Sequence, residues 1–473
     1  MTDILDASSR ELTAILATAP DLREGPALEE VLRILAERRT MDLSALPAGR
    51  QAALIRARSA RLLPGADRLA ELLESARADG RRLTVKFGID PTAADVHLGH
   101  AVPMILASRF QRMGHRVVFI VGDITARIGD PSGRSADRPP LTDEDIRRNL
   151  AGYREQVTPF FDFDRADFRF NSEWLARVGL PEFIGVLARL PLAASLQRED
   201  FRTRLAAGSG LTMAELVYSV VMALDSVEID ADIELGGLDQ LLNLQMCRRV
   251  MENAGREPEV VIATGLIEGT DGTGAKMSKS KGNYVGLAFG PQDVFGRLMS
   301  AADRLLPDYL RALTELLDPE VELLLELAER RRIHPMGAKT LLASDVTGTV
   351  HGRQAAAGAR EAFRARFSTR RFSDLAGLPA AAVAEHAATG PAELLTGVTG
   401  AVGSRNQVRR VAAGGGLRLV AESAAGGQRT AVLAEADADL PLAELLRARP
   451  GFAPAEGLRV FLKCGRRLVE LAS

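Results

Sequence analysis

The sequence is poor in cysteine and has no long apolar run. Only Cys247 and Cys464 occur in 473 residues, which excludes a disulfide framework and an all-cysteine zinc site. No stretch approaches the roughly 18 consecutive apolar residues of a membrane-spanning helix. The N-terminal residues carry acids and lack the basic and apolar regions of a secretory signal. We therefore expect a cytoplasmic protein with no membrane partner.

The chain also lacks an excess of charge of either sign. Its 60 Lys and Arg residues nearly balance 62 Asp and Glu residues, giving a net charge of -2. Binding to nucleic acid would therefore need a local basic patch rather than the field of the whole molecule. The hydrophobic share of 46% and the charged share of 26% are ordinary for a globular protein.

The spacing of apolar residues divides the chain into segments. Residues 1–80 show helical periodicity and are predicted to form a helical N-terminal extension. Over 81–286, strand-like segments such as "LTVKFGI" and "HRVVFIVGD" alternate with helical patterns, which predicts an α/β domain with a Rossmann-like, doubly wound parallel sheet. Residues 287–365 are predicted to be a helical domain, 366–398 a linker, and 399–473 a small α+β module.

Two histidines follow the first predicted strand, in "GIDPTAADVHLGH". Ligands of doubly wound sheets bind beyond the carboxyl ends of the strands. His97 and His100 are three residues apart, so they share one side of a first helical turn, where the helix N-terminus attracts anions such as phosphate. Such histidines can donate hydrogen bonds to charge that develops on a phosphate oxygen. The alternative is a polar helix start without further function.

A second motif is the lysine-rich stretch "DGTGAKMSKSKGN" at 271–283. Lys276, Lys279 and Lys281 lie among glycines and serines, which suits a loop that closes over a polyphosphate. The alternative is a solvated charged loop.

Together, H-x-G-H and K-M-S-K-S resemble the signatures of class I aminoacyl-tRNA synthetases. The blocks "GDITARIGDPSGRSADRPPLT", "RFNSEWL", "ADIELGGLDQLLNL" and "GAKMSKSKGNYVGL" narrow the resemblance to bacterial tyrosyl-tRNA synthetases, over residues 83–365. The stretch "GSRNQVRRVAAGGGLRLV" resembles the S4-like RNA-binding module that ends those proteins. The resemblance implies adenylation of L-tyrosine by ATP, transfer to tRNA, Mg²⁺ that arrives with ATP rather than at a protein metal site, and a homodimer.

The resemblance also implies roles for individual residues. The catalytic set would be Thr92, His97, His100, Lys276 and Lys279. The ATP-binding set would be Gly99, Arg134, Arg138, Gly236, Asp239 and Lys279. The amino-acid-binding set would be Asp90, Asp130, Asn171, Tyr218, Met222, Asp225 and Gln240. Arg405, Arg409 and Arg410 would meet RNA phosphates, with a solvated basic helix as the alternative.

Three positions depart from the family pattern. Met222 stands where a glutamine usually contacts the substrate ammonium, Leu224 replaces a tyrosine, and Leu238 replaces a small hydroxyl residue. Loss of one such hydrogen bond weakens binding by about 0.5–3 kcal/mol. Retained Asp225 favours a substrate with a phenol or another hydroxyl donor. Two alternatives therefore stay open: a related enzyme that adenylates a different amino acid, possibly for an acceptor other than tRNA, and a non-catalytic RNA-binding protein on the same scaffold.

Overall fold

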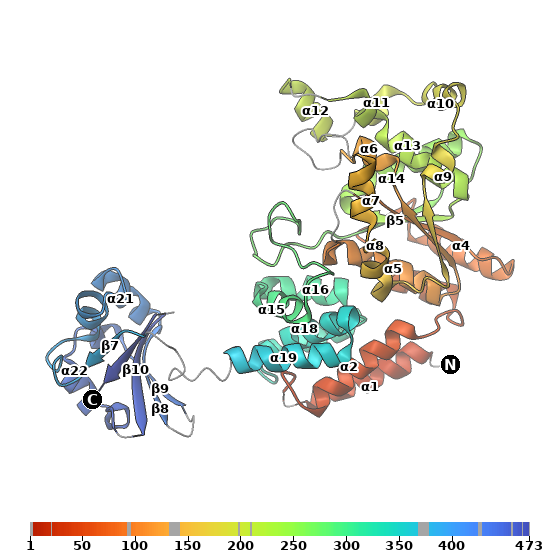
Figure 1. Ribbon diagram of the computed structural model, residues 1–473. Coiled ribbons are helices and arrows are strands. Elements are labelled where there is room, and N and C mark those ends of the chain that lie inside the picture. Colours follow the sequence, from red (N-terminus) through yellow and green to blue (C-terminus); the bar gives the residue numbers. More distant parts are fainter. Residues whose placement is uncertain are drawn as a thin grey trace. The chain divides into compact units, whose positions relative to one another are not determined.

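The chain forms two compact units, residues 1–363 and 364–473 (Figure 1). The computed structural model describes residues 3–19, 21–91, 96–131, 142–196, 199–208, 211–367, 378–423, 428–455, 457–465 and 467–472. Among the described helices, none is long and apolar enough to cross a bilayer.

A six-stranded sheet organises the first unit, with strand order β1-β6-β5-β2-β3-β4. The strands are β1 (Arg61–Leu63), β2 (Thr84–Ile89), β3 (Arg116–Val121), β4 (Ala166–Phe170), β5 (Ile233–Gly237) and β6 (Val260–Thr264). Strands β2 to β6 are parallel, which confirms the predicted Rossmann-like sheet. β1 pairs antiparallel with β6 and was not predicted, because three residues are too short to show a strand period.

Helices cover both faces of this sheet. Helix α5 (Leu98–Arg112) packs its apolar side chains against the face that carries Val85 and Phe87. Helices α13 (Met213–Ile229) and α14 (Leu241–Asn253) contact each other and cover the opposite face. The order of the strands reverses between β2 and β5, and this reversal is the point where doubly wound sheets bind ligands.

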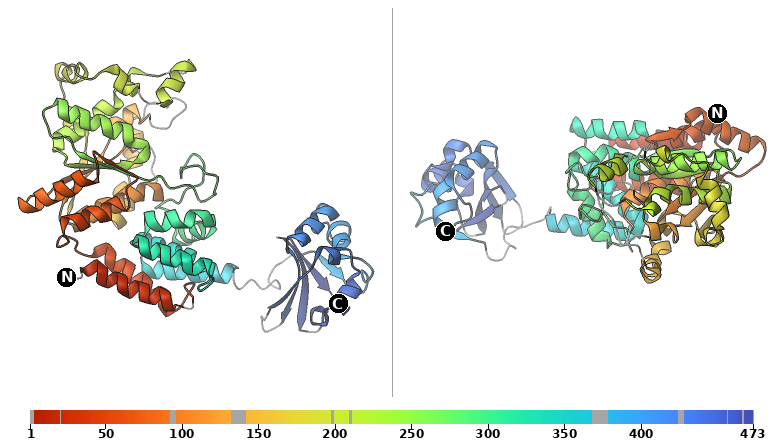
Figure 2. Two further views of the ribbon diagram at one scale, coloured as in Figure 1. Left: turned by 180° about the vertical axis from the view of Figure 1, so that it is seen from behind. Right: turned by 90° about the horizontal axis from the view of Figure 1, so that it is seen from above.

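The N-terminal helices belong to the same core as the sheet. Figures 1 and 2 show the hairpin of α1 (Ile4–Thr18) and α2 (Pro26–Thr40) beside the helices of 291–367. α1 contacts α17 (Asp318–Glu329), and α2 contacts α18 (Pro335–His351). The predicted extension is therefore packed into the first unit rather than separate from it.

The second unit contains a five-stranded sheet of order β7-β11-β10-β8-β9. Its strands are β7 (Ala380–Ala382), β8 (Leu417–Ser423), β9 (Gln428–Val432), β10 (Leu458–Cys464) and β11 (Arg467–Ala472). Over 378–398 the structure differs from the linker predicted for 366–398, of which residues 368–377 lie outside the described residues. β7 pairs with β11, and Leu394 and Leu395 are buried in the core of this unit, although the Ala-rich and Gly-rich composition had indicated a connecting segment.

Candidate functional site

A cavity of about 420 Å³ lies at the point where the strand order reverses. Most of the described residues predicted for the site line it. They are Asp90, His97, Gly99, His100, Asp130, Tyr218, Met222, Asp225, Gly236, Asp239, Gln240 and Lys276. Thr92, Arg134 and Arg138 lie outside the described residues.

The two histidines begin helix α5. His97 is the N-cap, and its Nδ1 accepts the backbone N–H of Gly99 at 3.1 Å. Nδ1 of His100 accepts the backbone N–H of His97 at 3.3 Å. Burial, together with the nearby lysine charges, lowers the pKa of His97 to about 2 and that of His100 to about 4. Both rings are therefore neutral near pH 7, and each carries its proton on Nε2 as a hydrogen-bond donor.

Gly99 lets the two imidazoles pack closely. The ring centroids of His97 and His100 are 3.9 Å apart. A Cβ atom at Gly99 would lie 2.9 Å from Cε1 of His97, closer than real contacts allow, so any larger residue would displace the ring.

The lysine-rich loop also lines the cavity, through residues 276–278 and Ser280. Nζ of Lys276 lies 2.8 Å from Oδ2 of Asp239, which follows β5. The charge of Lys279 acts on both histidines. The end of the loop is joined to the start of α5, because the N–H of Leu98 donates to the carbonyl of Val285 at 2.9 Å. Cationic and neutral donors thus face the same part of the cavity.

Two carboxylates lie in the middle of the cavity. Asp90 accepts hydrogen bonds from the hydroxyl of Tyr218 at 2.9 Å and from that of Thr125 at 2.6 Å. Burial raises the pKa of Asp90 to about 7. Asp130 accepts from Nε2 of Gln240 at 2.7 Å and from Nδ2 of Asn243 at 3.2 Å. Together these groups can hold a cation such as a substrate ammonium.

Asp225 also lines the cavity and is almost fully buried. Its Oδ1 accepts from Nε1 of Trp174 at 2.8 Å, and its Oδ2 accepts from Nδ2 of Asn171 at 3.4 Å. Asn171 is itself fixed, because its Oδ1 accepts the N–H of Ile124 at 3.0 Å. Burial raises the pKa of Asp225 to about 6.

The three departures from the family pattern differ in their surroundings. Met222 is half-buried and lines the cavity. Leu224 packs into the apolar cluster of α13 and α14. Leu238 is 41% exposed and is not among the residues that line the cavity. Only Met222 therefore alters the lining of the site.

The sequence analysis missed several polar residues at this site. Lys86 and Glu234 line the cavity and form a fully buried ion pair of 2.7 Å. Thr125 donates a hydrogen bond to Asp90, and Trp174 donates one to Asp225. The sequence contained a signal for Lys86 and Glu234, because each is a charged residue in the middle of a strand that a parallel sheet buries on both faces.

One group of described residues has the composition of a metal site: Glu234, Cys247 and Glu259. All three are buried, and the ammonium of Lys86 already bonds Glu234. Since Lys86 supplies the positive charge that these carboxylates need, the group does not suit a metal ion.

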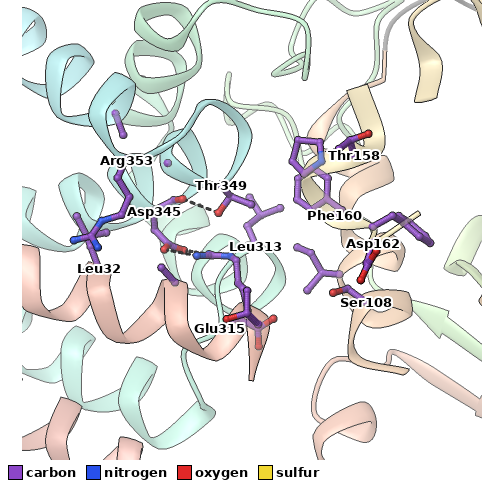
Figure 3. A pocket seen from close by; sticks show the side chains of 18 of the residues that line it. Leu32, Ser108, Thr158, Phe160, Asp162, Leu313, Glu315, Asp345, Thr349 and Arg353 are labelled. Carbon is purple, nitrogen blue, oxygen red and sulfur yellow. Dashed lines mark hydrogen bonds and ion pairs between the residues drawn. The ribbon is translucent and has the colours of Figure 1, made fainter. Parts of the chain in front are cut away.

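A second cavity, of about 450 Å³, lies among α2, α5, α18 and α19 (Arg353–Phe367) (Figure 3). The charged side chains around it include pairs that neutralise each other. Arg39 pairs with Asp345, and Arg112 lies 3.1 Å from Glu315. None of the predicted catalytic or substrate-binding residues that the structure describes lines this cavity. The candidate chemistry therefore belongs to the first cavity alone.

The arginines predicted to bind RNA lie on α21 (Arg405–Ala413) of the second unit. Arg405 pairs with Glu393, and Arg409 lies 2.9 Å from Asp439. Arg410 is exposed.

Comparison with known proteins gives a consistent result. The family model "tRNA synthetases class I (W and Y)" matches residues 78–368. The tyrosine–tRNA ligase of Oleidesulfovibrio alaskensis is 40% identical over 352 residues, which cover 74% of this chain and 88% of that protein. The tyrosine–tRNA ligase of Thermotoga maritima is 38% identical over 352 residues, which cover 74% of this chain and 86% of that protein.

Solved structures share the fold. A C-terminally truncated mitochondrial tyrosyl-tRNA synthetase of Coccidioides posadasii aligns with a TM-score of 0.56 at 23% identity, covering 71% of this chain and 99% of that chain. The tyrosyl-tRNA synthetase of Archaeoglobus fulgidus, complexed with L-tyrosine, aligns with a TM-score of 0.52 at 19% identity, covering 66% of this chain and 99% of that chain.

Proposed function

Since the chain belongs to the class I tRNA synthetases of the tryptophan and tyrosine group, we propose that it is a tyrosine–tRNA ligase that acts in the cytosol. It would activate L-tyrosine with ATP to tyrosyl-adenylate and then transfer the tyrosyl group to the 3′ end of tRNA. The observation that carries the proposal is a single cavity lined by neutral His97 and His100, by Lys276 of the lysine-rich loop and by buried Asp225.

In the first step, the tyrosine carboxylate attacks the α-phosphorus of ATP, and pyrophosphate leaves. This carboxylate is ionised at neutral pH, so the reaction needs no general base. The protein contributes position and charge stabilisation. The Nε2–H groups of His97 and His100 donate to phosphate oxygens as negative charge develops, and the ammonium groups of Lys276 and Lys279 hold the leaving pyrophosphate. Mg²⁺ enters with ATP as part of the substrate and neutralises the polyphosphate.

The rest of the cavity holds the two substrates. We place the ATP ribose against Gly236 and Asp239, with Gly99 leaving room for phosphate beside the histidines. The tyrosine ammonium would lie among Asp90, Asp130 and Tyr218, with Gln240 holding Asp130 by a 2.7 Å hydrogen bond. The phenol would donate to Asp225, which Asn171 and Trp174 orient.

The tRNA would also contact the second unit, which we propose to be an S4-like RNA-binding module. Arg410 is exposed on α21, and Arg405 and Arg409 can exchange their carboxylate partners for phosphates. Replacing Arg410 by alanine should weaken tRNA binding and lower its salt dependence, without affecting adenylation.

We propose further that the protein is a homodimer. Large apolar side chains that are 53% to 75% exposed gather on α10 (Leu180–Leu187), α11 (Leu192–Ser195), α12 (Glu199–Ala206) and the start of α13. They are Leu180, Ile184, Leu192, Leu205 and Met213. A second copy would cover them. Replacement of Ile184 by arginine should convert a dimer to a monomer in analytical ultracentrifugation.

Aminoacylation of total bacterial tRNA with labelled tyrosine tests the proposed function. We expect acid-precipitable label that depends on ATP and is lost when His97 and His100 are both replaced by asparagine. Charging with tyrosine that is unaffected by this double replacement would contradict the catalytic assignment. Absence of charging by the wild-type protein would contradict the ligase function.

A second candidate function is adenylation of a different amino acid. The observation that favours it is Met222, an apolar residue that lines the cavity near the proposed ammonium site. Exchange of label between pyrophosphate and ATP with another amino acid, but not with tyrosine, would support it.

A further inference from the structure

The cavity is lined by a buried lysine, Lys86, to which the proposed adenylation reaction gives no role. Lys86 lies in the middle of β2 and has 0% exposed surface. Its Nζ donates to Oε1 of Glu234 at 2.7 Å, to Oγ of Ser226 at 2.8 Å and to the carbonyl of Met222 at 3.3 Å. An ammonium has three N–H donors, so all of them are satisfied by the protein. Lys86 therefore has no N–H left to donate to a substrate.

These contacts fix the part of α13 that carries Asp225. Met222 and Ser226 are one helical turn apart, and Asp225 directly precedes Ser226. Glu234 lies opposite Lys86 in the pairing of β2 with β5. Lys86 thus joins one turn of α13 to two adjacent strands, and the carboxylate of Asp225 projects from that same turn into the cavity.

Lys86 also balances a surplus of buried acids. The titratable groups that act on Asp225 are Lys86 from β2, Asp90 after it, Glu234 from β5 and Tyr218 from α13. Asp130 acts in turn on Asp90 and Tyr218, and Cys247 and Glu259 interact with Glu234 and Lys86. Burial and the neighbouring Glu234 raise the pKa values of Glu259 and Cys247 well above their usual range, which disfavours the charged form of both. Burial raises the pKa of Asp225, and Lys86 is the strongest influence that opposes the rise.

Building on the proposed function, we propose that Lys86 is a positioning and specificity-determining residue: from beneath the cavity, it holds Asp225 in place and ionised to accept a hydrogen bond from the substrate hydroxyl. An ionised carboxylate is the stronger acceptor for a phenol. A protonated Asp225 would instead present a donor of its own, and the preference for tyrosine over phenylalanine would weaken.

Two variants separate this role from a merely structural one. Glu234→Gln keeps the cation but removes an acid, so it should ease the ionisation of Asp225. The double variant Lys86→Met/Glu234→Gln removes the cation without leaving a charged partner buried alone, so it should hinder that ionisation. Lys339→Met is the matched control, because Lys339 is also buried and bonds the carbonyl of Ala301 at 2.6 Å, but does not line the cavity.

The assay is amino-acid-dependent exchange of label between pyrophosphate and ATP from pH 5 to pH 9, with KM measured for tyrosine and for ATP. In the wild type, the KM for tyrosine should rise in two steps as the pH falls, near 7 where Asp90 takes up a proton and near 6 where Asp225 does; the lower midpoint is the one to follow in the variants. Loss of a neighbouring opposite charge moves a carboxylate pKa by about 1–3 units. Loss of Glu234 in the double variant offsets part of that rise, and a net rise of about one unit would increase the KM for tyrosine about twofold at pH 7.

We expect the midpoint to move up in the double variant, down in Glu234→Gln, and not at all in Lys339→Met, while the KM for ATP stays constant. The tyrosine to phenylalanine preference at pH 7 should fall in the double variant. If both variants fold and are active but the pH midpoint of the KM for tyrosine is unchanged in each, the role of Lys86 is overturned and the ligase function stands. Should the double variant fail to fold, the midpoint of Glu234→Gln alone decides. Absence of exchange in the wild type would instead contradict the proposed function, and the role of Lys86 with it.

Discussion

Replacing Arg38 by methionine tests whether the N-terminal helices are a structural part of the catalytic unit. Arg38 lies on α2 with a side chain that is 1% exposed. It bonds both carboxylate oxygens of Glu320 at 2.7 Å, the carbonyl of Glu315 at 3.1 Å and the hydroxyl of Ser8 at 2.8 Å. It therefore connects the first two helices to α17 through a buried pair.

The expected loss of stability follows from burial. Removing one partner of a buried ion pair leaves the other charge without compensation, which destabilises a protein by about 3–5 kcal/mol. We expect a loss of this size for Arg38→Met, and recovery of most of it in Arg38→Met/Glu320→Leu, because an apolar pair needs no compensation. Arg33 lies on the same helix with three carboxylate partners, but its side chain is 34% exposed. Arg33→Met should change the stability little, since solvent screens such pairs.

Urea unfolding followed by tryptophan fluorescence measures these differences. Trp174 is the single tryptophan of the chain and lies beside Asp225, so the signal reports on the first unit. A loss for Arg33→Met equal to or larger than that for Arg38→Met would refute the argument from burial. If adding Glu320→Leu does not restore the stability lost in Arg38→Met, the loss does not come from the unpaired charge of Glu320.

Three further predictions concern the active site. His97→Asn keeps an acceptor at the N-cap but loses the Nε2–H donor. The kcat for pyrophosphate exchange should therefore fall by about 10²–10³, with little change in the KM for tyrosine. A larger effect on this KM than on kcat would contradict the assignment. Gly99→Ala should lower kcat, because the added Cβ would displace the ring of His97. Gly296→Ala is the control and should behave as wild type, because a Cβ added there meets nothing within 4 Å. Equal kcat in both variants would show that the space beside Gly99 does not matter for His97. The KM for tyrosine should rise in two steps as the pH falls, near 7 where Asp90 takes up a proton and near 6 where Asp225 does; Asp225→Asn should abolish the lower step and keep the upper one.

Much of the fold could be predicted from the sequence, because apolar periodicity marks long strands and helices. "LTVKFGI" and "HRVVFIVGD" formed the adjacent strands β2 and β3 as expected. β1 and β7 could not be predicted, because each has three residues and owes its position to pairing with a partner remote in the sequence. The packing of α1 and α2 against α17 and α18 depends on long-range contacts that no local pattern reveals.

Some residues of the candidate site could likewise be predicted from the sequence, and others could not. His97, His100 and Lys276 stood in recognisable motifs, and the structure places all three around one cavity. Lys86 and Glu234 had no motif, and their meaning appeared only when the register placed them side by side in adjacent strands. The fold also separates the unusual residues, since Met222 and Leu224 both pack against the apolar cluster of α13 and α14 but only Met222 lines the cavity.

The central claim is that this cavity activates tyrosine with ATP. The most direct measurement is ATP–pyrophosphate exchange, without tRNA, in the presence of each proteinogenic amino acid in turn. We predict exchange with tyrosine, much less with phenylalanine, and none with the other amino acids. Exchange with a different amino acid and not with tyrosine, or no exchange at all, would contradict the account.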